Sequence, residues 1–109
     1  MSDNAPDLKE ILSQARDLQA KLKKVQEEAG AKTVRAESGA GMVAVVANLR
    51  GEIVEVKIDK SLFETEDLSM LQDLVRAAVN EALRQAREGM QHEISEAAGG
   101  IILPNVKLF

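Results

Sequence analysis

The chain contains no cysteine, no tryptophan and no tyrosine, and its only aromatic residues are Phe63 and Phe109. The absence of cysteine excludes disulfides, thiolate metal sites and cysteine nucleophiles. Proteins that read single strands or RNA usually stack bases on aromatic side chains, and this chain has no such platform. His92 is the only histidine, and we expect it to face solvent. One histidine without cysteine does not supply the residues of a metal site or of a nucleophile system. We therefore expect no metal site, no cofactor, no small-molecule substrate and no enzymatic activity.

Long apolar runs and excess positive charge are also missing. No segment approaches the ~20 apolar residues of a membrane span. The first residues are polar and acidic, which is not the pattern of a signal peptide. We therefore expect a cytoplasmic protein without membrane contact. The net charge is −4, which argues against a general nucleic-acid binder unless the charges are segregated on different faces.

The 109 residues predict a single domain over 1–109. We expect residues 1–6 to be flexible. The C-terminal tail, residues 101–109, has six apolar residues out of nine, so we expect it to be docked rather than disordered.

The first long segment has the pattern of a helix over residues 6–29. Apolar residues recur at alternating spacings of three and four, as in a heptad seam. Asp7 and Glu10 predict a capping box at its start, and Gly30 ends it. The seam consists of Leu8, Ile11, Ala15, Leu18, Leu22, Val25 and Ala29.

The middle of the chain predicts three strands, at 32–38, 42–49 and 53–59, joined as an antiparallel meander. Residues 38–41 and 48–51 contain the glycine and asparagine that tight hairpins require. The glycines at 39 and 41 also suggest a phosphate loop. A hairpin is favoured, because a phosphate loop leads into a helix and these glycines lead into a strand.

A second helix is predicted over about 66–97, with Thr65 as its N-cap and a short helical turn at 61–64 before it. Gly99 and Gly100 end it. Its expected buried stripe is Leu68, Leu71, Val75, Val79, Ala82, Ala86 and Met90. The order α-β-β-β-α places the chain in the α+β class, with a three-stranded antiparallel meander flanked by two long helices.

These helix lengths favour a homodimer. The second helix would be ~45 Å long, whereas a compact domain of this size is roughly 35 Å across. The 42–49 strand is apolar on both faces, and one layer of helices covers only one. A second copy would bury the remaining apolar surface. The alternative is a monomer whose C-terminal tail covers that second face.

The basic residues form two lines. Lys9, Arg16 and Lys23 are seven residues apart beside the first helix's seam, and Arg76, Arg84 and Arg87, with Asn80, line the second helix. Rows of cations suit contacts with successive phosphates of duplex DNA. The alternative is ordinary surface charge that keeps exposed helices soluble.

Several segments together resemble the YbaB/EbfC family of bacterial nucleoid-associated proteins, over nearly the whole chain. The glycine turn and the Ile-Asp-Lys-Ser-Leu junction at 58–62 are the more specific parts. The matching segments are residues 14–28, 37–41, 56–62, 73–82 and the Leu103-Pro104 pair in the tail.

The resemblance implies a homodimer whose long helices project like tweezers and bind duplex DNA in the nucleoid, for nucleoid organisation or gene regulation. It locates DNA binding on the helices only. We therefore nominate Lys9, Arg16, Lys23, Arg76, Arg84 and Arg87 on charge grounds. The alternative function is a homodimeric adaptor that binds other proteins through the projecting helices.

Overall fold

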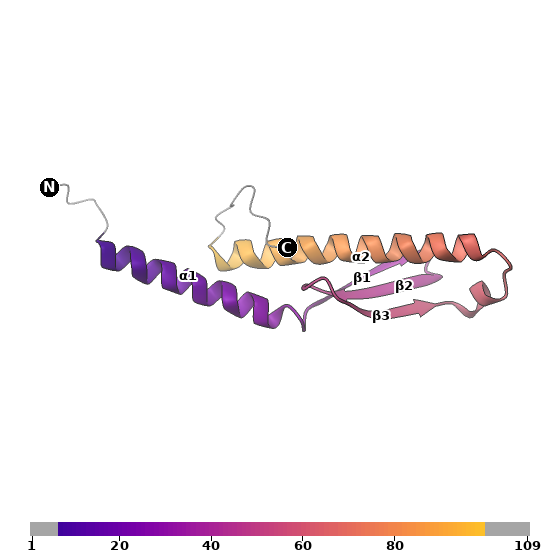
Figure 1. The fold of residues 1–109 in the computed structure, drawn as a ribbon, viewed down its shortest axis with the longest axis horizontal. Coiled ribbons are helices and arrows are strands. Elements are labelled where there is room, and N and C mark those ends of the chain that lie inside the picture. The colour runs from indigo at the N-terminus through magenta and orange to yellow at the C-terminus, as the bar shows by residue number, and fades with distance from the viewer. Residues whose placement is uncertain (1–6, 100–109) are drawn as a thin grey trace.

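The computed structural model describes residues 7–99, and it is elongated rather than compact (Figure 1). Its extents are 78 × 23 × 18 Å and its radius of gyration is 20.4 Å, whereas a compact chain of 100 residues has a radius of gyration near 13 Å. The expectation that the helices are longer than a compact domain of this size is therefore confirmed.

The predicted α-β-β-β-α order is confirmed, with boundaries within two residues of those expected. The elements are α1 (Leu8–Glu28), β1 (Thr33–Ser38), β2 (Val43–Asn48), β3 (Ile53–Ile58), the 3-10 helix η1 (Lys60–Phe63) and α2 (Leu68–Ala97). The strands form one antiparallel sheet in the order β1-β2-β3. Residues 1–6 and the tail 101–109, with their expected flexibility and docking, lie outside the described residues.

Local signals fix most element ends. Asp7 caps α1, where its carboxylate accepts from the backbone N–H of Lys9. The predicted cap of α2 is wrong, because Asp67 rather than Thr65 occupies that position and accepts from the N–H of Met70 at 2.9 Å. The Thr65 hydroxyl instead accepts from the N–H of Asp67, which orients the capping residue.

Both glycine turns are hairpins. Gly39, Ala40 and Gly41 all have positive φ, and the turn leads directly into β2, so the hairpin interpretation of the glycines is confirmed over the phosphate loop. A Cβ on Gly39 would lie 3.0 Å from the Leu74 side chain, and the Ser38 hydroxyl donates to the Leu74 carbonyl at 2.6 Å. This turn is therefore attached to α2.

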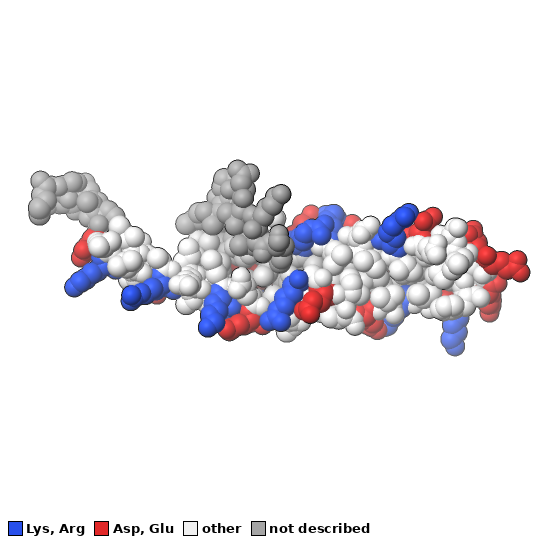
Figure 2. Space-filling model, viewed as in Figure 1, with Lys and Arg blue, Asp and Glu red and all other residues white. Residues whose placement is uncertain are grey.

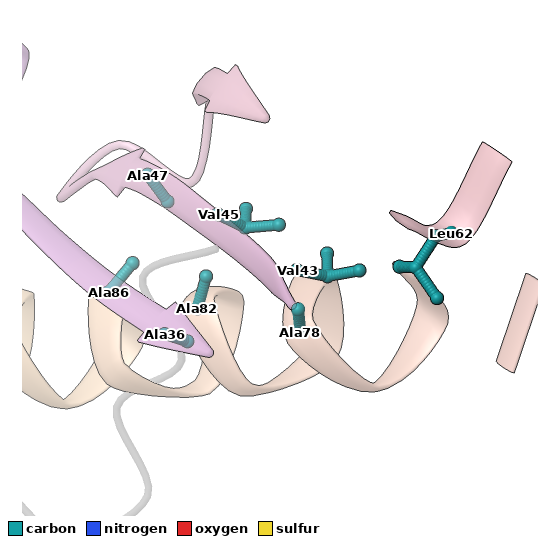
Figure 3. Packing of buried hydrophobic residues seen from close by; sticks show 8 residues of the cluster. All are labelled: Ala36, Val43, Val45, Ala47, Leu62, Ala78, Ala82 and Ala86. Carbon is teal, nitrogen blue, oxygen red and sulfur yellow. The ribbon is translucent and has the colours of Figure 1, made fainter. Parts of the chain in front are cut away.

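The core lies between α2 and the β1–β2 half of the sheet (Figure 3). Ala78, Ala82 and Ala86 recur every four residues on α2 and are fully buried against Val43 and Val45. Four-residue spacing places side chains on one helix face, and small side chains there allow the helix axis to approach the sheet closely. Gly89 continues this face, because a Cβ there would lie only 2.8 Å from Leu49.

The predicted buried stripe of α2 is confirmed at Ala82, Ala86 and Met90 but not in its first half. Leu68 is 62% exposed, and Val75 and Val79 are only half-buried, whereas Ala78, which was not predicted, is completely buried. In that first half, the larger apolar residues were expected to face the core. The sheet instead packs against Ala78, which lies on the same helix face as Ala82 and Ala86, and the larger residues flank this contact.

The second face of β2, which was expected to be buried by a second copy, is already partly covered within the single chain, where Val46 is half-buried. Ala44 is 4% exposed within the single chain. Its cross-strand neighbours, Glu37 and Lys57, have long side chains on the same face of the sheet. The uncovered apolar surface lies on β3, where Val54 is 53% and Val56 45% exposed.

We predict that Ala82→Leu lowers the free energy of unfolding by about 1–3 kcal/mol, because the larger side chain overpacks the closest helix–sheet contact. Ala77→Leu is the matched control, since Ala77 lies on the exposed side of the same helix turn. Urea unfolding of both variants at one protein concentration measures the difference. Equal stabilities would contradict the close-packing account.

Candidate nucleic-acid interface

The α1 helix is an arm that leaves the sheet at residue 29 and extends beyond the end of α2 (Figure 1). None of its residues is buried. Only its last turns are attached, through a small cluster in which Ala29 packs with Leu49 and Met90 and is flanked by Val25 and Ile94. The arm therefore exposes most of its surface, including its charged side chains.

Arg50, in the β2–β3 turn, attaches the arm to the sheet. Its guanidinium donates to the carbonyl of Gln26 at 3.2 and 3.3 Å and to that of Glu27 at 3.3 Å. These carbonyls belong to the last turn of α1, where helix carbonyls lack intrahelical partners and the dipole attracts cations. No local sequence pattern indicates this role of Arg50, because the pairing joins segments 23–24 residues apart.

The turn that carries Arg50 is itself fixed by Asn48. This asparagine is 4% exposed, and its side-chain oxygen accepts from the N–H groups of Arg50 and Glu52 at 3.0 and 3.1 Å. Its amide nitrogen donates to the Glu52 carboxylate at 2.8 Å. Because the Asn48 side chain bonds to both sides of the turn, it holds the turn in the conformation that directs the Arg50 guanidinium toward α1.

The three α1 candidates, Lys9, Arg16 and Lys23, are all exposed. None of them forms an ion pair with another residue in the described range 7–99. Lys24, beside them, forms only a long pair with Glu28 at 4.0 Å. Their spacing of seven residues places them along one side of the arm, as the sequence predicted.

The α2 candidates differ from one another. Arg84 is held between Glu81 and Glu88, with both N–O distances 2.5 Å, and Arg76 pairs with Asp73 at 2.9 Å. Arg87 is exposed and makes no ion pair with any described residue. The structure therefore divides the second predicted row into two neutralised arginines and one open arginine.

The Glu81–Arg84 pair is maintained at any physiological pH. Hydrogen bonds from Arg84 and then Gln85 lower the pKa of Glu81 from 4.5 to about 2, and the same contact raises the pKa of Arg84. A carboxylate with a lowered pKa stays ionised above that value, so Arg84 keeps its counter-charge. These i,i+3 and i,i+4 neighbours compete with any phosphate for this guanidinium.

Charge is segregated along the molecule. The α1 arm carries five basic and four acidic residues, whereas residues 59–73 at the opposite end carry five acidic and one basic. Figure 2 shows acidic side chains gathered at that far end, around the turn that precedes α2, and basic side chains along the arm. The net charge of −4 thus arises mainly away from α1.

Three further observations concern the described residues. His92 is exposed as predicted, 3.9 Å from Glu96. Within residues 7–99, no three histidine or carboxylate side chains gather as a metal site would require. No helix in this range combines the length and apolar character needed to cross a bilayer.

Comparison with known proteins identifies the family. A model of the YbaB/EbfC DNA-binding family matches residues 4–101. The chain belongs to this family. The resemblance drawn from the sequence motifs is thereby confirmed.

Relatives of this family share most of the chain. A nucleoid-associated protein of Syntrophobacter fumaroxidans is 45% identical over 89% of this chain and 88% of its own length. A nucleoid-associated protein of Desulfotalea psychrophila is 39% identical over 94% and 97%. A crystal structure of an uncharacterized protein from Helicobacter pylori has the same fold, with a TM-score of 0.74, 24% identity, and coverage of 87% of this chain and all of that one.

We predict that Arg50→Ala loosens the arm. Amide hydrogen exchange in the last turn of α1 should rise about two- to fivefold, which corresponds to the ~0.3–1 kcal/mol of a cation at a helix C-terminus. Arg50→Lys is the control, because it keeps the charge but not the planar fork, and it should restore protection only in part. Unchanged exchange in both variants would show that the Arg50 contacts do not hold α1.

Proposed function

We propose that this protein is a nucleoid-associated, non-enzymatic protein of the cytoplasm that binds duplex DNA through its α1 arm. The observation that carries this proposal is the row of Lys9, Arg16 and Lys23, exposed and without carboxylate partners among the described residues. The family's description as DNA-binding and the names of its relatives support it.

The dimensions of the row suit phosphate contacts. From Lys9 to Lys23, α1 rises ~21 Å at 1.5 Å per residue, which is the length of about six base pairs of duplex at 3.4 Å each. Lysine and arginine side chains along this length neutralise phosphates without reading base edges. Arg87 adds an open cation on α2, whereas Arg76 and Arg84 contribute less because carboxylates already occupy them.

We also propose that two copies associate through β3 and the adjacent side of α2. An apolar groove lies there, lined mainly by Ile58, Leu71, Val75 and Val79. Both edge strands carry a charged pair on one face, Arg35 with Glu37 on β1 and Lys57 with Glu55 on β3. On the other face α2 packs against Val34 and Ala36 of β1, whereas Val54 and Val56 of β3 stay exposed. An edge strand with exposed apolar side chains promotes association with other chains, and a symmetry-related second copy covers it.

In this dimer each chain contributes one α1 arm, and neither arm takes part in the interface. Arg76 and Asn80 line the same groove as Val75 and Val79, so these two polar residues would lie beside the partner rather than beside DNA. Two basic arms on one particle provide two sets of phosphate contacts. Binding at both arms strengthens overall affinity without any new contact type.

We predict that Arg16→Gln weakens binding to duplex DNA and lowers the steepness of its salt dependence. Each lost phosphate contact reduces the slope of log K against log salt by about 0.9, and a dimer loses two such contacts. Arg84→Gln removes the same net charge from a residue already paired with Glu81 and Glu88. Its slope should remain that of the unmodified protein.

Mobility shifts over a salt series measure both variants. If the two substitutions reduce the slope equally, the total charge rather than the α1 row governs binding. If the unmodified chain binds with no salt dependence, the phosphate-contact mechanism is wrong.

We predict that Val56→Glu dissociates the dimer, because it places a charge on the apolar edge strand. Light scattering should report twice the 11.8 kDa chain mass for the unmodified protein and the single chain mass for the variant. Thr33→Glu introduces the same residue on the opposite edge strand and should leave the dimer intact. A dimeric Val56→Glu protein would assign the interface to another face.

A further inference from the structure

The apolar seam of α1 is covered over only half of its length. Leu18, Leu22 and Val25, toward the sheet, are half-buried. Leu8 and Ile11 of the seam, and Leu12 beside it, are 68%, 46% and 49% exposed. Large apolar side chains at heptad spacing form a continuous stripe that helices normally bury. Three such residues close together on the arm therefore require a covering segment.

The end of α2 explains where the coverage stops. α2 runs antiparallel to α1, with Met90 beside Ala29 and Ile94 beside Val25 in one cluster. Figure 1 shows the last turn of α2 lying alongside the middle of α1, which continues beyond it. The helix ends at Ala97, with Gly99 at φ 72°. The uncovered half of the seam therefore begins close to the point where α2 ends.

The nine residues that follow, Ile101–Phe109, have the length and composition to cover this half. Six of the nine are apolar. An extended segment of nine residues reaches ~30 Å, whereas the seam from Leu18 back to Leu8 measures only ~15 Å. The segment is also tethered at the end of α2, which raises its local concentration at the seam to roughly millimolar, far above that of a separate molecule.

We propose that Ile101–Phe109 of the same chain packs along the N-terminal half of α1, over Leu8, Ile11 and Leu12. The tail continues the antiparallel α1–α2 packing past the end of α2 and stiffens the arm. Lys9 and Arg16 are at positions next to the seam rather than within it, so the basic side of the arm stays open. This docking does not depend on the proposed DNA binding.

The absence of cysteine permits a direct test by disulfide formation in the full-length chain. Ala15→Cys places a thiol on the seam, and Asn105→Cys places one in the tail without removing an apolar side chain. The control pair, Ser13→Cys with Asn105→Cys, keeps the tail thiol and moves the other to the opposite side of α1. We expect the intramolecular disulfide to form about tenfold faster in the Ala15 pair than in the control.

Equal rates for the two pairs would overturn the proposal, because a tail that does not occupy the seam meets both faces alike. A mixture of isotopically labelled Ala15→Cys protein with unlabelled Asn105→Cys protein separates the same chain from a second copy. We expect no mixed disulfide on mass spectrometry. A mixed disulfide formed as fast as the intramolecular one would assign the tail to a partner's α1 and overturn same-chain docking.

Hydrogen exchange gives an independent measurement. Ile102→Ser with Leu103→Ser removes two apolar side chains from the tail and should increase exchange over residues 8–17 about tenfold, while the Ala78–Ala86 part of α2 stays protected. The control, Lys107→Ser, changes a polar residue of the same tail and should leave exchange unchanged. Unaltered protection of residues 8–17 in the double variant would contradict the proposal, whatever the state of DNA binding.

Discussion

The close contact between the small-residue face of α2 and strands β1 and β2 is the constraint on which the rest of the structure depends. Ala78, Ala82 and Ala86 are completely buried there, and Leu49 lies so close to Gly89 that an added Cβ would meet it at 2.8 Å. Because this narrow face is used for the core, the larger residues Val75 and Val79 turn toward β3. The apolar groove beside β3 follows directly from that rotation.

The same packing leaves α1 without a place in the core. The sheet has three strands, and α2 covers one face of β1 and β2. Helix α1 is therefore held through its C-terminal half, by the Ala29 cluster and by Arg50. An arm attached at one end exposes its charged side chains far from the acidic end of the molecule. This separation reconciles a net charge of −4 with a basic row that contacts phosphates.

The two rows of basic residues, on α1 and on α2, differ more in their pairing with carboxylates than in the number of residues they contain. Arg84 lies one helical turn from both Glu81 and Glu88, so its neighbours along α2 neutralise it before any ligand approaches. Glu10 and Asp17 are sequence neighbours of Lys9 and Arg16, but on a helix adjacent residues point about 100° apart and do not pair. Two rows that look equivalent in sequence thus differ in the charge they present.

The sequence by itself determined the element order, the turns and the excess helix length, because heptad spacing, strand alternation, glycine and capping residues act within a few positions of one another. It also contained the family motifs. Only the tertiary structure decided that Ala78 is buried in α2 while Leu68 is exposed, that Ala44 is buried within one chain, and that Arg50 caps α1. These depend on distances between segments far apart in the chain, which local patterns do not encode.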